Sequence, residues 1–72
     1  MQGTIKTFHT EKFFGFITGE DNQDYFFHGS QLQTEQEEMC IYIGDVVEFD
    51  PVMSSKGIRA ENVRIVKQNV EN

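Results

Sequence analysis

The chain has 72 residues, a single cysteine and a formal net charge of −6, from 12 acidic and 6 basic side chains. This length fits one domain, and one cysteine excludes an internal disulfide and indicates a reducing compartment. No apolar run is long enough to cross a bilayer and the N-terminus does not have the pattern of a signal peptide, so we expect a cytoplasmic protein with no membrane partner.

Turn signals divide the chain into five extended segments. Residues 2–9 are rich in β-formers and predict a first strand. Residues 14–18 and 24–28 predict the next two strands, joined by a turn at 19–22. Residues 30–42 are polar and acidic, which predicts a long loop with one helical turn.

The second half of the chain predicts two more strands. We expect a strand at 45–50, where Val47 and Phe49 point to one face, and Pro51 to mark its end or an edge. Residues 53–57 predict a turn and 58–66 a last strand, with Ala60 and Val63 in the core. Five short strands without a long helix favour a small closed barrel, because closure removes exposed edges.

Seven of the nine aromatic residues fall between positions 8 and 27, mostly in two runs. Residues 12–17 read Lys-Phe-Phe-Gly-Phe-Ile, and residues 25–30 read Tyr-Phe-Phe-His-Gly-Ser. Strand side chains alternate between faces, so Ile17, Tyr25 and Phe27 share the core face. Rings on the opposite face form a group that we name the aromatic platform: Phe14, Phe16, Phe26 and His28.

A domain of this size needs one apolar face for its core, so the platform requires another explanation. Flat rings accept any unpaired nucleobase through its π-face, and neighbouring lysines can meet phosphates. We therefore predict stacking on single-stranded RNA or DNA, which exposes the base faces that a duplex hides. The competing interpretation, that the platform rings are core residues, is weaker because the other face already supplies a core.

Several aromatic and histidine positions allow more than one role. Phe8 lies opposite Ile5 in the strand alternation, so contact at the rim and partial burial are both open. Phe13 and Tyr42 are either additional stacking rings or simple packing residues, and we favour packing. His28 is either a stacking ring or a structural histidine.

A metal site is the weakest of these alternatives. Its ligands would have to come from His9, His28 and Cys40, which contain no short ligand pair. We expect Cys40 to be a small hydrophobic residue and the protein to need no metal or other cofactor.

The order of these segments resembles a cold-shock domain, the five-stranded OB-fold barrel of bacterial cold-shock proteins. Four segments carry the resemblance at matching spacing, residues 1–9, 12–17, 25–30 and 57–63, and it extends over about residues 1–66. It implies an all-β, antiparallel five-stranded OB-fold barrel over residues 1–67, followed by a short tail at 68–72 that we expect to be frayed.

The resemblance also implies a binding site for single-stranded nucleic acid. The platform residues match the family's base-stacking positions, and four others match its flanking contacts: Lys6, Phe8, Lys12 and Asp24. We add Lys56 and Arg59, which flank a later turn and supply positive charge. The acidic net charge is the main objection, because binding to phosphates normally requires a basic surface.

Five positions depart from the family pattern. Thr7 replaces a first-strand tryptophan and Gly29 replaces an aromatic residue, so two stacking rings are absent and we expect weaker binding. His9 replaces an asparagine, Phe13 a glycine and Ile58 a proline.

By resemblance, the expected function is that of a nucleic-acid binding protein that keeps RNA from forming secondary structure. The alternative is a degenerate cold-shock barrel that contacts another protein and binds nucleic acid weakly. We expect a monomer, with a strand-exchanged or edge-paired dimer as the alternative. No motif for catalysis is present, so we expect no enzymatic activity and no small-molecule substrate.

Overall fold

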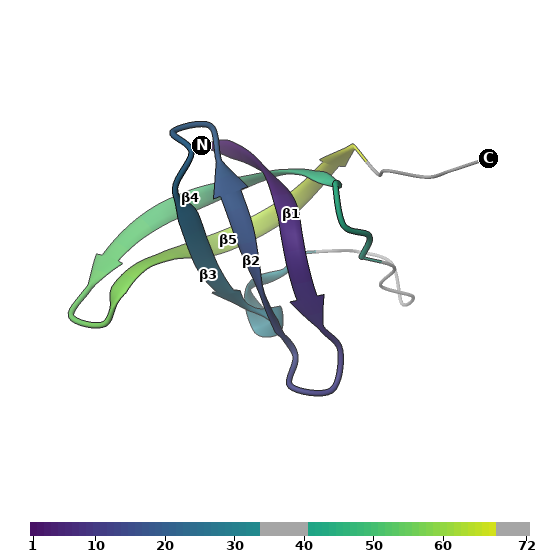
Figure 1. Cartoon of the computed structure of the whole chain (residues 1–72), viewed down its shortest axis with the longest axis horizontal. Helices are drawn as coiled ribbons and strands as arrows, with labels where there is room; N and C mark the ends of the chain where they lie inside the picture. The colour runs from purple at the N-terminus through teal and green to yellow at the C-terminus, as the bar shows by residue number, and fades with distance from the viewer. Residues whose placement is uncertain (34–40, 68–72) are drawn as a thin grey trace.

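The chain forms an all-β barrel, seen in a computed structural model that describes residues 1–33 and 41–67. Its strands close in the order β1-β2-β3-β5-β4 (Figure 1). A single turn of 3-10 helix, η1 (Gly29–Gln31), follows the third strand. The strands are β1 (Gln2–His9), β2 (Phe14–Gly19), β3 (Asp24–His28), β4 (Val46–Ser54) and β5 (Gly57–Lys67).

Most of the barrel is antiparallel, as the sequence predicts. The pairs β1–β2, β2–β3, β1–β4 and β4–β5 are all antiparallel. The seam that closes the barrel differs, because β3 meets β5 in parallel through a bridge between Phe26 and Arg59. A second parallel bridge, between Leu32 and Val63, extends this contact past the end of β3.

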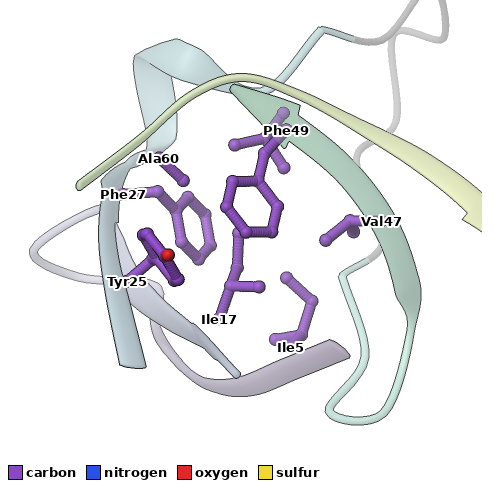
Figure 2. Packing of buried hydrophobic residues seen from close by; sticks show 8 residues of the cluster. Ile5, Ile17, Tyr25, Phe27, Val47, Phe49 and Ala60 are labelled. Carbon is purple, nitrogen blue, oxygen red and sulfur yellow. The ribbon is translucent and has the colours of Figure 1, made fainter. Parts of the chain in front are cut away.

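Alternating side chains from the five strands fill the inside of the barrel (Figure 2). The side chains predicted for the core face of β2 and β3, Ile17, Tyr25 and Phe27, are buried. The predicted inward residues of the last two strands are buried as well. The complete buried apolar cluster is Ile5, Ile17, Tyr25, Phe27, Val47, Phe49, Ala60 and Val63.

The fourth strand is longer than the sequence indicated. Pro51 does not end β4 but lies inside it, opposite Ala60 of β5. The pairing of β4 with β1 stops at Glu48, so within the described residues Pro51 has a paired neighbour on one side only, where a missing N–H is tolerated. The predicted turn at 53–57 is correspondingly shorter, because β4 continues to Ser54 and β5 begins at Gly57.

Asp45 lies just before β4 and not in it, and its side chain is fully buried. One carboxylate oxygen accepts the backbone N–H of Tyr42 at 3.0 Å. This buried carboxylate therefore supports the chain as it enters β4.

A β-bulge in β1 changes which residues face inward. Ile5 pairs with Ile17, but the next pair is Thr7 with Phe16, so Lys6 has no partner in the ladder. The bulge places Phe8 on the core side, where it is half-buried and stacks on Phe27 with a centroid distance of 5.8 Å. Of the two alternatives for Phe8, the structure shows partial burial.

Part of the sequence-based predictions falls outside the described residues. The structure has a turn of helix, η1, at the start of the loop predicted for residues 30–42. Cys40, the acidic stretch at 35–38 and the tail at 68–72 lie outside the described residues. Across residues 1–33 and 41–67, no helix has the length and apolar character needed to span a membrane.

Candidate nucleic-acid interface

The four platform residues lie side by side on the outer face of β2 and β3. The strand register pairs Phe14 with His28 and Phe16 with Phe26. Phe26 is 39% exposed and His28 is exposed, whereas Phe14 and Phe16 are half-buried against their neighbours. The alternation of side chains predicted from the sequence is therefore confirmed for β2 and β3, with the platform outside and the core residues inside.

Ring contacts hold the platform together. Phe26 lies 5.6 Å from Phe14 in a tilted arrangement and 5.8 Å from Phe16 in a T-shaped one. Phe14 and Phe16 are 6.3 Å apart, again edge to face. These distances are typical of favourable aromatic pairs, so the rings position one another while leaving part of their surface to solvent.

His28 has a structural role in addition to its place on the platform. It is the N-cap of η1, and its Nδ1 accepts the backbone N–H of Ser30 at 3.1 Å. The Ser30 hydroxyl lies 2.8 Å from the same nitrogen. Because Nδ1 acts as an acceptor, the neutral ring carries its proton on Nε2. The cap thus fixes the orientation of the ring.

His9 joins the platform, which sequence reasoning missed. After the bulge, Thr7 and His9 pair with Phe16 and Phe14, and the His9 ring lies 4.9 Å from that of Phe14. The two-residue alternation of β1 places His9 on the platform face only if the bulge at Lys6 is taken into account, and the sequence does not show that bulge. Thr7, at the position of the family's tryptophan, offers no ring.

Phe13 occupies the turn before β2 with a left-handed backbone, at φ 57°. The turn thus accommodates a large side chain where the family pattern has glycine. Its ring packs over Gly29 and meets Phe8 edge to face at 6.1 Å. The exposed fraction of Phe13 is 37%, so the packing is incomplete.

The structure brings some of the predicted charged residues to the platform and not others. Arg59 lies beside it, because its backbone bridges to Phe26 across the seam. Lys12 lies exposed in the turn that precedes β2. Lys56 lies in the turn between β4 and β5, at the tip of a hairpin that extends beyond the barrel (Figure 1).

Acidic partners reduce the positive charge that this surface can offer. Lys6 is paired with Asp24, its Nζ lying 2.7 Å from a carboxylate oxygen. This hydrogen bond, together with a smaller contribution from Thr18, holds the pKa of Asp24 below its usual value of 3.8. Arg59 is likewise paired with Glu61, at 2.9 Å. Any phosphate at these cations must compete with a carboxylate already present.

The sequence model of the 'Cold-shock' DNA-binding domain matches residues 1–66 of the chain. The chain belongs to the cold-shock domain family. A cold shock-like protein of Aquifex aeolicus is 46% identical over 66 residues, which cover 90% of this chain and 93% of that protein. Cold shock protein 1 of Lactiplantibacillus plantarum is 44% identical over 61 residues, which cover 85% of this chain and 91% of that protein.

A solved structure shows the same fold. The structure titled drosophila Unr CSD456 superposes with a TM-score of 0.70 at 26% sequence identity. The match covers 99% of this chain but 28% of that longer one. These comparisons agree with the nucleic-acid binding interpretation of the cold-shock barrel and not with the alternative of a protein-interaction module.

Proposed function

We propose that this cold-shock domain protein binds single-stranded RNA or DNA by stacking bases on the aromatic platform. The observation that carries the proposal is the cluster of rings on the outer face of β2 and β3. It stands outside a core already completed by Tyr25 and Phe27. Side chains at Lys12 and Arg59 flank the rings and would contact the phosphates, while Lys6 and Asp24 would lie at the edge of the bound strand.

The same binding would act on RNA structure without an energy source. A protein that binds the open strand and not the duplex shifts the equilibrium toward the open strand by mass action. We expect the protein to do this as a cytoplasmic monomer, through residues 1–67. Light scattering over a range of concentrations tests the monomer, and a mass that rises with concentration would contradict it.

A titration with a fluorescently labelled oligo-dT tests the platform, since the chain has no tryptophan to report binding. We expect binding at low and at physiological salt, and weaker binding to a duplex. The double variant Phe14→Ala and Phe26→Ala should weaken binding by about thirtyfold or more, given about 1–3 kcal/mol for each stacked base.

Val66→Ala is the matched control, because Val66 is an exposed apolar residue, at 52%, on β5 and outside the platform. It should bind as the unaltered protein does. Unchanged affinity in a folded Phe14→Ala, Phe26→Ala protein would show that the platform is not the binding surface.

A further inference from the structure

The platform ends at the pair formed by Phe14 and His28, and one more ring lies beyond that pair. In the register of β2 and β3, the residues that follow outward from this pair are Phe13 and Gly29. Phe13 is not in the stacking set predicted from sequence, and its ring lies 5.7 Å from that of His28 in a T-shaped contact. The ring therefore adjoins the platform at its open end.

The backbone of Phe13 is held from both sides in an unusual conformation. Its φ of 57° lies in the left-handed region, which a bulky residue seldom adopts. The N–H of Phe13 donates to the carbonyl of His9 at 2.8 Å, and its own carbonyl accepts the N–H of Gly29 at 2.7 Å. Strained residues held this firmly concentrate at functional sites.

The ring of Phe13 lies face-down on Gly29. A Cβ atom added at Gly29 would lie 2.5 Å from Cδ2, 2.6 Å from Cδ1 and 2.6 Å from Cε2 of the ring. Near-equal distances to atoms on opposite sides of the ring place that Cβ over the ring face and not at its edge. Only glycine at position 29 leaves room for the ring, so the two positions are sterically coupled.

No ring of residues 1–33 or 41–67 stacks in parallel on the other face of the Phe13 ring. The ring contacts of Phe13 with the described residues, to Phe8 and to His28, are both T-shaped, and 37% of the residue is exposed. Lys12 precedes it and makes no ion pair with any residue that the structure describes. A flat ring that is partly exposed and has no parallel stack, beside a lysine without an ion pair among the described residues, suits one nucleotide, with its base on the ring and its phosphate at the lysine.

We propose that Phe13 stacks one further base of the bound strand, next to the base on His28, in the place that an aromatic side chain at position 29 would otherwise serve. This proposal rests on the proposed function, because it assumes that a strand lies along the platform. It makes the binding site one nucleotide longer than the platform alone provides.

The test compares Phe13→Gly with the unaltered protein in titrations with labelled oligo-dT of increasing length. Glycine suits the left-handed backbone, so Phe13→Gly should fold. It should bind a long oligo-dT about five- to hundredfold more weakly, and its affinity should stop increasing one nucleotide earlier. If circular dichroism shows that this variant does not fold, Phe13→Leu decides instead, because it keeps an apolar side chain without a flat ring.

A swapped variant, Phe13→Gly with Gly29→Phe, tests whether the location of the ring matters. It removes the clash and returns a ring to the same end of the platform, so it should recover most of the lost affinity, whereas Val66→Ala should behave as the unaltered protein. Affinity within twofold of the unaltered protein for Phe13→Gly would overturn the proposal, as would a folded swapped variant that binds no better than Phe13→Gly. Either outcome would leave the proposed function intact, provided that the double variant Phe14→Ala and Phe26→Ala still weakens binding. The proposed function itself would be refuted if the unaltered protein bound no oligonucleotide.

Discussion

At the scale of single residues, Gly15 allows the platform and the core to lie back to back. It is buried in β2 between Phe14 and Phe16, facing inward. A Cβ atom there would collide with the carbonyl oxygen of Thr7 and lie 2.9 Å from the ring of Phe27. The absence of a side chain therefore lets β1 and the Phe27 ring approach β2 closely.

We predict that Gly15→Ala destabilises the protein by about 1–3 kcal/mol, the usual cost of overpacking a well-packed interior. The added methyl group would push Phe27 or β1 outward, and the platform rings on the other side of β2 would shift with the strand. Urea unfolding at neutral pH measures the change in the free energy of unfolding. A loss below about 0.5 kcal/mol, the range of ordinary surface substitutions, would contradict the close packing.

The sequence was sufficient for most single residues of the core and platform, because side chains in β2 and β3 alternate without interruption. It failed where the backbone departs from that alternation. The bulge at Lys6 moves Phe8 inward and brings His9 to the platform. The left-handed conformation of Phe13 turns its ring onto Gly29. Neither the bulge nor the left-handed residue produces a periodic pattern of side chains, so the sequence did not predict them.

At the scale of elements, a hydrogen bond closes the hairpin that carries the platform. The hydroxyl of Tyr25 in β3 donates to a carboxylate oxygen of Asp21 in the preceding turn at 2.6 Å. This bond lowers the pKa of Asp21 and raises the pKa of Tyr25 above 10.0. The backbone N–H of Gln23 also donates to Asp21, at 3.2 Å, so one carboxylate organises the turn between β2 and β3.

The shifted pKa values predict how stability depends on pH. The folded-state pKa values of Asp21 and Asp24 lie below the unfolded value of 3.8, so their stabilisation is present above about pH 4 and is lost as pH falls through the folded values. The raised pKa of Tyr25 acts in the opposite range, because its stabilisation is present below pH 10.0 and is lost at higher pH.

Tyr25→Phe should therefore lower the urea midpoint at neutral pH and reduce the acid-induced loss of stability, leaving the part that belongs to Asp24. Urea titrations between about pH 7 and about pH 2 measure both effects. An acid profile as steep as that of the unaltered protein would contradict a role for this hydrogen bond.

At the scale of the whole molecule, charge limits how the protein can bind nucleic acid. The net charge is −6, and three of the six basic side chains are in ion pairs: Lys6 with Asp24, Arg59 with Glu61 and Arg64 with Glu48. Lys12, Lys56 and Lys67 make no ion pair within the described part of the chain. Binding should therefore rest on stacking more than on phosphate contacts.

Because few phosphate contacts are available, we predict that the binding affinity depends only weakly on salt concentration. Each phosphate neutralised on a single strand contributes about −0.7 to the slope of log K against log salt concentration, so contacts from one to three of these lysines give a slope of about −1 to −2. Lys12→Gln should make the slope shallower by about 0.7. Oligo-dT titrations at several salt concentrations measure it, and a slope steeper than about −4 would mean that phosphate contacts dominate.

The seam between β3 and β5 has a consequence for the order in which the molecule forms. β1, β2 and β3 follow one another in sequence and pair through short turns, whereas the bridge between Phe26 and Arg59 joins distant parts of the chain. Contacts between distant residues carry a larger loop-closure entropy and slow folding. We therefore expect the three-stranded meander, with the platform already on it, to form before the barrel closes. During synthesis, the aromatic platform would then emerge before β5 has been made.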